Sequence, residues 1–300
     1  MTAWLKEMQK TYPDLKLTLP FCTQEYMYNG QGYYRNFPEN IQIVMTGGRV
    51  WGEVTNDFTT TFTNNVGRGP YMWINWPCTD NSKKHLIMGG YTTFLHPGVD
   101  PNKIQGIVLN PMQQSEPSKV AIFGNACYSW NIWQSEEEAQ RCWNASFKYV
   151  DHNSALETKA SAALRELSKH MINQNMDGRV TALQESVDLK DRLASFKEAI
   201  SNGTTISDEQ FEDLLNEFTI LKNASATYRA QAGDTRVKDQ IVYWLNCWDD
   251  TTDAAINYIK AIKAAQDGDA NDKIWDLYAA GQAAFEKSKT YGFNYVDHLE

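Results

Sequence analysis

The sequence predicts two regions of different fold class: an α/β region with about four short parallel strands, followed by an all-helical region. In the first 134 residues, short apolar runs alternate with helix-like segments and turn-rich loops. From Ser135 onward proline is absent, glycine is sparse, and Ala, Glu, Lys and Leu dominate at helical spacing. This change in composition places the boundary between the two regions at residues 134 and 135.

The predicted strands cover residues 16–22, 41–46, 71–76 and 105–110. Each is short, rich in aliphatic or aromatic residues, and followed by a polar or turn-forming loop, as in parallel α/β folds. A helix over residues 3–12 is expected before the first strand, because Trp4, Leu5 and Met8 follow helical spacing. A parallel barrel needs about eight strands, and an open parallel sheet needs cover on both faces. Four strands therefore indicate either a small sheet or half of a barrel.

The second region carries helix-start signals and apolar stripes. Ser135 and Glu138 have the spacing of a capping box, which satisfies free backbone N–H groups at a helix start, and Ser207 and Gln210 repeat it. Two apolar stripes follow helical spacing: Leu156, Ala160, Ala163, Leu164, Leu167 and Met171, then Phe211, Leu214, Leu215, Phe218 and Leu221. Turn-forming dipeptides at 202–203 and 267–268 separate helices, and further helices are expected over 237–265 and 271–289.

Composition excludes several classes of partner. With 28 basic and 37 acidic side chains the chain has a net charge of −9, and no basic run is present, so we expect no nucleic-acid partner. No apolar run approaches the about eighteen residues of a membrane helix, and the N-terminus has no apolar signal-peptide core, so no membrane partner is expected. The five cysteines are scattered without a Cys-x-x-Cys pair, which argues against a metal site, and no cofactor is expected.

Polar and aromatic residues follow the third predicted strand in a pattern suited to a sugar. Asn75 lies at the end of this strand and Asp80 follows five residues later, with Trp73 and Trp76 between or before them. A carboxylate accepts hydrogen bonds from two adjacent hydroxyls, an amide both donates and accepts, and an aromatic face stacks on the apolar face of a pyranose. The alternative is structural, with both tryptophans in the core and Asp80 capping the next helix.

Two other strand ends carry weaker signals. Asn110 ends the fourth predicted strand and precedes Pro111, which is also an ordinary turn signal. The loop at 23–30, after the first strand, contains Tyr26 among other polar and aromatic residues. In parallel barrels, substrate contacts gather where strands open into such loops.

A set of short motifs links these strand ends to a known family. In chain order they are Gln24-Glu25-Tyr26, Met45-Thr46-Gly47, Trp73-Ile74-Asn75-Trp76-Pro77-Cys78-Thr79-Asp80, Val108-Leu109-Asn110-Pro111-Met112, and Ser118-Lys119 with Tyr128-Ser129-Trp130-Asn131. Their set and order resemble glycoside hydrolase family 84, which contains bacterial β-N-acetylglucosaminidases, often described as hyaluronidases, and animal O-GlcNAcases. The resemblance implies that residues 1–134 form the C-terminal half of a (β/α)8 TIM barrel and residues 135–298 a helical bundle. From its own sequence, Leu299-Glu300 is expected to be a vector-derived tail.

The resemblance also implies a reaction and a set of site residues. The family cleaves with retention by a substrate-assisted route, in which the 2-acetamido group of the sugar attacks its own anomeric carbon. Tyr26 corresponds to the tyrosine that steadies the resulting oxazoline, whereas Trp73 and Asn75 correspond to the acetamido pocket. Asp80 corresponds to the residue that holds O4 and O6, and Asn110 to the one that contacts O3 and O4.

The family's two adjacent catalytic aspartates follow the fourth barrel strand, and the resemblance places them upstream of residue 1, so this chain is expected to contain no catalytic residue of that pair. Asp249-Asp250 is the chain's Asp-Asp sequence, and we interpret it as a solvated helix face because it lies in an Ala- and Ile-rich helical pattern. The five histidines match no functional position.

Two hypotheses follow. In the first, the chain is part of a β-N-acetylglucosaminidase that removes terminal β-linked N-acetylglucosamine from glycans or glycoproteins, and it is inactive without the missing N-terminal half of the barrel. In the second, it is a non-catalytic carbohydrate-binding or protein-interaction module. Open strand edges predict self-association. The resemblance implies a secreted or cell-surface bacterial protein whose signal lies upstream.

Overall fold

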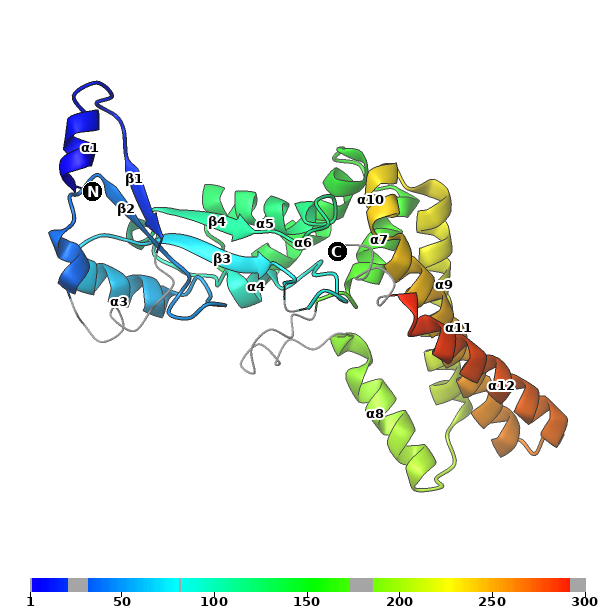
Figure 1. Cartoon of the computed structure of the whole chain (residues 1–300). Coiled ribbons are helices and arrows are strands. Elements are labelled where there is room, and N and C mark those ends of the chain that lie inside the picture. The colour runs from blue at the N-terminus through cyan, green and yellow to red at the C-terminus, as the bar shows by residue number, and fades with distance from the viewer. Residues whose placement is uncertain (1, 21–31, 81, 173–185, 292–300) are drawn as a thin grey trace. The chain divides into compact units, whose positions relative to one another are not determined.

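The computed structural model describes residues 2–20, 32–80, 82–172 and 186–291, and these fall into two units. The first unit comprises the described residues up to Thr79 together with Gly90–Ser146. The second comprises the described residues of Asp80–Gly89 and those from Phe147 onward. The first unit contains the sheet and the second is helical (Figure 1).

A four-stranded parallel sheet forms the centre of the first unit, in the order β1-β2-β3-β4. The strands are β1 (Leu17–Pro20), β2 (Ile41–Met45), β3 (Tyr71–Pro77) and β4 (Gly106–Asn110). All four lie where the sequence predicts them, although the last two residues of the first predicted strand are outside the described residues. Within the described part of the chain, β1 and β4 each have a strand neighbour on one side only.

Short helices connect and cover these strands. They are α1 (Thr2–Met8), η1 (Gly32–Asn36), α3 (Asn56–Val66), α4 (Tyr91–Phe94), η2 (Pro101–Lys103), α5 (Lys119–Trp130) and the first part of α6 (Glu136–His152). α3 begins where the Thr55 hydroxyl accepts a hydrogen bond from the Phe58 N–H at 3.1 Å. It ends at Gly67, whose φ of 84° is the left-handed conformation that glycine adopts without strain.

β3 separates a buried face from a partly exposed one. Met72, Ile74 and Trp76 are fully buried on one face. Trp73 and Asn75 project from the other face, where the Trp73 side chain is 39% exposed. Because successive side chains of a strand point to opposite faces, the alternation gives β3 one buried face and one partly exposed face.

Aromatic rings form the core on the buried face. The Trp76 ring stacks on Phe94 with centroids 5.5 Å apart, and its edge meets Tyr91 at 5.7 Å. Tyr91 in turn stacks on Trp133 at 5.5 Å. This arrangement requires glycine at position 124 on α5, because a Cβ atom there would lie 2.5 Å from the Tyr91 ring. The strand that carries Asn75 is therefore fixed from below by an aromatic layer.

The second unit consists of antiparallel and crossing helices. They are α7 (Lys159–Ser168), α8 (Val187–Ser201), α9 (Asp208–Gln231), α10 (Thr235–Gln240), α11 (Val242–Gln266) and α12 (Asn271–Ser288). α11 packs against α12 and α9, and α7 packs against α9. Gly281 of α12 allows the close approach to α11, because a Cβ atom there would lie 2.9 Å from the Tyr258 ring. No helix among the described residues has the length and apolarity needed to cross a bilayer.

The predicted helix starts are present. At Ser207 and Gln210 both hydrogen bonds of the capping box form, and α9 begins at the next residue. At Ser135 the hydroxyl accepts from the Glu138 N–H at 3.3 Å, and α6 begins at Glu136. The turns at 202–203 and 267–268 follow α8 and α11, as expected.

Three helix boundaries differ from the prediction. The first helix, expected over residues 3–12, ends at Met8. Leu156 does not belong to the helical stripe: it is 75% exposed, because α7 begins only at Lys159, after a capping box between Thr158 and Ser161. The expected helix over 237–265 is two helices, α10 and α11, which are interrupted at the fully buried Ile241. Because the apolar pattern continues through Ile241, the sequence pattern does not indicate this interruption.

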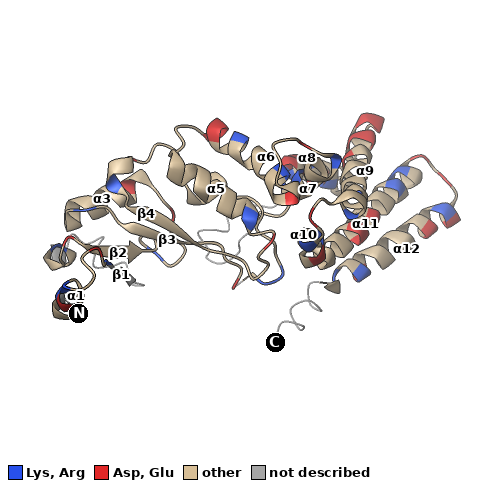
Figure 2. Cartoon of the chain, turned by 90° about the horizontal axis from the view of Figure 1, so that it is seen from above, with Lys and Arg blue, Asp and Glu red and all other residues tan. Residues whose placement is uncertain are grey.

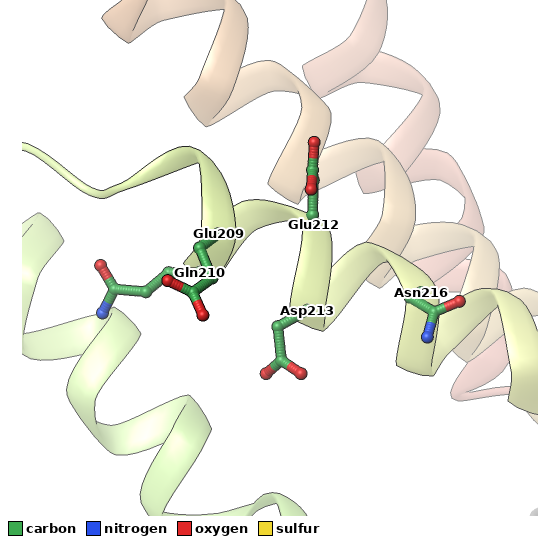
Figure 3. Close-up of a pocket in the computed structure, with 5 residues that line it drawn as sticks. All are labelled: Glu209, Gln210, Glu212, Asp213 and Asn216. Carbon is green, nitrogen blue, oxygen red and sulfur yellow. The ribbon is translucent and has the colours of Figure 1, made fainter.

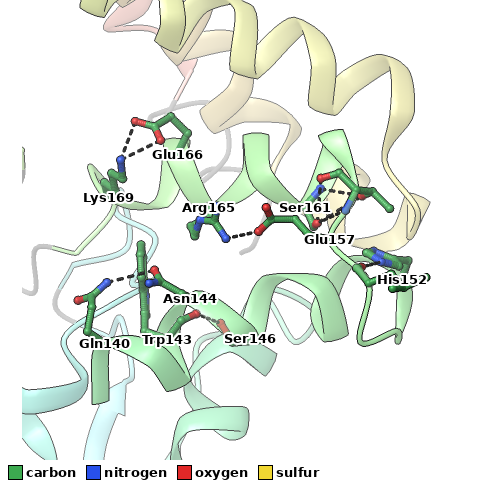
Figure 4. A network of polar contacts seen from close by, with 12 residues as sticks. Gln140, Trp143, Asn144, Ser146, His152, Glu157, Ser161, Arg165, Glu166 and Lys169 are labelled. Carbon is green, nitrogen blue, oxygen red and sulfur yellow. Dashed lines mark hydrogen bonds and ion pairs between the residues drawn. The ribbon is translucent and has the colours of Figure 1, made fainter. Parts of the chain in front are cut away.

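Several charged side chains on the helices form ion pairs within one helix or with a neighbouring segment. Figure 4 shows this on α7, where Arg165 pairs with Glu157 and Lys169 pairs with Glu166 at 2.8 Å. Figure 2 shows basic and acidic positions interspersed along α9, α11 and α12. Exposed pairs of this kind each contribute up to about 1 kcal/mol, so packing of the apolar stripes carries most of the stability.

A core substitution tests this assignment. Phe211 is 1% exposed and packs with Phe196, Ile206, Leu214 and Ile259. Phe211→Ala should lower the free energy of unfolding of the helical unit by about 3–5 kcal/mol, because it removes buried apolar surface and leaves a cavity. The matched change Phe285→Ala, at a ring that is 43% exposed, should cost less than about 1 kcal/mol. Urea unfolding followed by far-ultraviolet circular dichroism measures both, and equal costs would contradict the packing described.

The open sheet makes a second prediction. Among the described residues, the outer edges of β1 and β4 have no strand partner, and the partly exposed face of β3 carries the Trp73 ring. The isolated chain should therefore self-associate as its concentration rises. Sedimentation velocity measures this directly, and a single monomeric species across the concentration range would be the contrary result.

Candidate functional site

Three predicted site residues meet at the carboxyl ends of β3 and β4. The Asn75 side-chain oxygen accepts a hydrogen bond from the Trp73 indole N–H at 2.9 Å and another from the Asn110 side-chain amide at 3.1 Å. The register between the two strands is irregular after Ile74, and Pro77 rather than Asn75 is the partner of Asn110. We call Trp73, Asn75 and Asn110 the strand-end cluster.

The loop after β2 fixes the cluster from a third side. The Asn75 side-chain amide donates to the Val50 carbonyl at 2.6 Å. Because the Asn75 oxygen accepts two hydrogen bonds and its nitrogen donates to a carbonyl, the orientation of the amide is determined. Val50 is 49% exposed and was not among the predicted site residues. The loop begins within the Met45-Thr46-Gly47 motif, which is among those that carry the family resemblance.

The backbone of this loop, residues 46–53, is tightly constrained. The Thr46 hydroxyl donates to the Arg49 carbonyl at 2.6 Å. Gly47 has a φ of 92°, and a Cβ atom on Gly52 would lie 2.0 Å from the Thr46 carbonyl oxygen. The turn thus needs glycine at both positions, and the close approach holds the Val50 carbonyl beneath Asn75.

Three titratable residues join the same loop to the segment after α4. Glu53 accepts hydrogen bonds from Arg49 through one carboxylate oxygen and from His96 Nε2, at 2.8 Å, through the other. Burial raises the pKa of Glu53, but the hydrogen bond from His96 and the charge of Arg49 outweigh it, so the pKa lies below its ordinary value. The hydrogen bond to Glu53 raises the pKa of His96, against an opposing effect of burial.

The segment after Asn110 is anchored at the start of α5 through the Ser118-Lys119 motif. The Ser118 hydroxyl accepts from the Met112 N–H at 3.1 Å and donates to the Gln114 carbonyl at 2.8 Å. Ser118 is fully buried, and Lys119 beside it pairs with Glu116. The buried Ser118 therefore holds in place the segment that follows Asn110.

The other predicted site residues are Asp80 and Tyr26. Asp80 is exposed, follows the end of β3 by three residues and belongs to the second unit. Tyr26 lies outside the described residues. The roles expected of Asp80 and Tyr26 stay predictions. Among the described residues, no group of three or more His, Cys, Asp or Glu side chains could hold a metal ion.

Comparison with known proteins assigns the chain to a protein family. A family model for beta-N-acetylglucosaminidase matches residues 1–169, which is more than half of the sequence. The chain belongs to this beta-N-acetylglucosaminidase family. The resemblance drawn from the sequence motifs is thereby confirmed, and the strand-end cluster lies inside the matched residues.

Solved structures of similar proteins confirm the fold class of a partial barrel with a helical domain. The structure of CpGH84D matches with a TM-score of 0.82 and 27% identity, over 96% of this chain and 47% of that one. CpGH84B matches at a TM-score of 0.78 and 17% identity, over 97% and 51%. A mutant of the Thermobaculum terrenum O-GlcNAc hydrolase matches at 0.71 and 16%, over 96% and 60%. The chain thus spans about half the length of these structures.

The adjacent carboxylates of Asp249 and Asp250 are paired with neighbouring side chains. On α11, Asp249 pairs with Arg229 at 2.9 Å, and Asp250 pairs with Lys287 at 3.2 Å and accepts from the Tyr291 hydroxyl at 2.8 Å. The two carboxylates thus serve as partners of neighbouring side chains. Asp249, whose side chain is 37% exposed, fits the predicted solvated helix face, whereas the Asp250 side chain is only 14% exposed.

The surface of the helical unit also contains an acidic hollow on α9. It is lined by Glu209, Gln210, Glu212, Asp213 and Asn216 (Figure 3). Asp213 is already paired with Arg192 of α8 at 2.7 Å. The lining holds no aromatic or basic side chain that would stack on a sugar or bind an anion, so we assign it no part in the site.

The Glu53–His96 contact predicts a pH dependence. Because the His96 pKa is raised, the contact stabilises the fold fully below the ordinary value of about 6.5 and weakens as pH rises through the raised pKa. Because the Glu53 pKa is lowered, the contact also weakens as pH falls through that lower value. The groups that act on His96 are Glu53, the Thr93 carbonyl and the more distant Glu136, all of which favour its charged form.

Proton NMR titration of the imidazole measures this effect. The His96 midpoint should lie above the ordinary value and should fall toward it in Glu53→Gln, whereas Glu7→Gln, which removes an exposed pair with Lys10, should leave it unchanged. A wild-type midpoint at or below the ordinary value would show that burial, and not Glu53, dominates.

Proposed function

We propose that this chain provides sugar-binding residues of a retaining β-N-acetylglucosaminidase, which removes terminal β-linked N-acetylglucosamine from glycans or glycoproteins. The observation that supports this most directly is the strand-end cluster, which joins Trp73, Asn75 and Asn110 at the carboxyl ends of two adjacent parallel strands. Barrel enzymes place their substrate contacts at this end of the strands. Family membership supplies the class of substrate.

The chemistry of the cluster suits a neutral sugar. Within the described residues, Asn110 uses one amide N–H on Asn75, so a second N–H and its oxygen can pair with two ring hydroxyls. The Trp73 ring, 39% exposed, offers an apolar face for the acetamido methyl or the sugar ring. Asn75 is fixed by the Val50 carbonyl and is therefore preorganised, which lowers the cost of ordering the site on binding.

Two further contacts belong to the proposal. Asp80, as an exposed carboxylate, would accept hydrogen bonds from the O4 and O6 hydroxyls, and Tyr26 would steady the oxazoline. In the substrate-assisted route the acetamido oxygen forms a bond to the anomeric carbon as the glycosidic bond breaks, and water then opens the oxazoline with retention. This route differs from the more common one, in which an enzyme carboxylate is the nucleophile.

Proton transfer in this scheme needs two adjacent carboxylates near the sugar. We propose that they come from the preceding half of the barrel and not from Asp249 and Asp250. The chain alone would then bind sugar weakly and would not hydrolyse it. The whole protein would be secreted or bound at the cell surface, where its glycan substrates occur.

Reconstitution tests the proposal. Hydrolysis of an aryl β-N-acetylglucosaminide is measured with the chain alone, with the upstream half barrel alone, and with both polypeptides together. Activity is expected only in the mixture. Asn110→Ala should lower kcat/KM there by roughly tenfold to a hundredfold, because it removes hydrogen bonds to the sugar. Asn64→Ala, at an exposed position on α3, is the matched control and should have no effect.

The other outcomes of this experiment are equally informative. Activity in the chain alone would contradict the placement of the catalytic pair and would bring Asp249 and Asp250 back into consideration. A mixture that assembles but stays inactive would favour the second function class, a non-catalytic carbohydrate-binding or protein-interaction module.

A further inference from the structure

The Arg49, Glu53 and His96 side chains, which we call the loop ion cluster, lie outside the strand-end cluster and have no role in the proposed chemistry. Their side chains are 22%, 24% and 39% exposed. Both carboxylate oxygens of Glu53 are used, one on Arg49 and one on His96. A carboxylate held from two sides has one orientation, which makes it suited to fixing a loop in place.

One end of the loop ion cluster is attached to the rigid core. The His96 N–H donates to the Val54 carbonyl at 3.0 Å, and the Val54 N–H donates to the Phe94 carbonyl at 2.8 Å. The His96 carbonyl accepts from the hydroxyl of the fully buried Tyr128 at 2.7 Å. The His96 backbone is therefore held by two hydrogen bonds, and Glu53 is attached to it through the imidazole.

The other end of the cluster leads to the sugar site. Arg49 and Glu53 flank Val50 in the loop, and the Arg49 carbonyl accepts from the Thr46 hydroxyl at 2.6 Å. Val50 lies next to Arg49 and presents its carbonyl to Asn75 at 2.6 Å. A shift of the loop would move this acceptor and so release the Asn75 amide, on which Trp73 and Asn110 also depend.

We infer that Arg49, Glu53 and His96 are positioning residues for sugar recognition. They hold the 46–53 loop so that the Val50 carbonyl fixes the orientation of the Asn75 amide, and through it those of Trp73 and Asn110. The effect on sugar binding rests on the proposed function, whereas the effect on the geometry of the cluster does not. None of the three positioning residues needs to touch the substrate.

The Trp73 indole provides a direct readout, since its N–H donates to Asn75. In the full chain labelled with ¹⁵N, the indole signal of Trp73 is assigned through Trp73→Phe and compared between wild type and Glu53→Gln. We expect this signal to shift and the amides of residues 47–53 to exchange roughly tenfold faster, the size expected when a hydrogen bond to a charged group is lost. The signal of Trp133, buried in the aromatic core, should stay in place.

Conservative variants separate positioning from general destabilisation. His96→Gln retains an N–H donor for Glu53 and should keep the Trp73 signal close to that of wild type, whereas His96→Leu should shift it as Glu53→Gln does. Glu7→Gln removes an exposed ion pair of the same charge type and should change neither signal. A Trp73 signal that does not move in Glu53→Gln, or that moves together with Trp133, would overturn the inference.

The reconstituted mixture provides the functional arm. There Glu53→Gln should raise KM for the aryl glycoside about tenfold with a smaller change in kcat, because the contacts disturbed belong to binding. An unchanged KM together with a shifted Trp73 signal would overturn the link to sugar recognition. An inactive wild-type mixture would instead count against the proposed function, while the NMR comparison would still decide whether the loop ion cluster positions Asn75.

Discussion

The hydrogen bonds of the Asn75 side chain are the constraint on which the rest of the site depends. This one amide joins three segments that are far apart in sequence: the loop that carries Val50, strand β3 with Trp73, and the end of β4 with Asn110. An amide that donates in one direction and accepts in another can satisfy all three at once, which neither a carboxylate nor an aliphatic side chain could do. The aromatic core packed against β3 keeps the backbone of Asn75 rigid, so the side-chain amide extends from a fixed backbone position.

Much of the architecture could be predicted because local signals and tertiary packing agree. The four strands are short apolar runs that end in polar loops, and the start of α9 is a complete capping box between Ser207 and Gln210. The boundaries that were mispredicted are those where tertiary contacts prevail. The buried Ile241 continues the apolar periodicity through a break in the helix, and Leu156 matches a stripe to which it does not belong.

The site residues also divide into those that the sequence predicts and those that it does not. Trp73, Asn75 and Asn110 could be selected from the sequence because side chains of recognisable chemistry stand at strand ends. Val50 could not, because its contribution is a backbone carbonyl, and any residue has one. The Glu53–His96 contact joins residues separated by 43 positions, and no periodicity encodes such a pair. His96 matches no functional position in the sequence, and only its neighbours in the folded chain show that it holds Glu53.

The hydrogen bonds of the strand-end cluster determine how this sheet could be combined with strands from another protein. Every hydrogen bond described among Trp73, Asn75, Asn110 and Val50 begins and ends within the same four-stranded sheet and its loops. A sheet of this kind could be grafted beside a different set of preceding strands and would carry its polar contacts along unchanged. Designers could then exchange the sheet as a whole module, and would need to redesign only the contacts at the outer edges of β1 and β4.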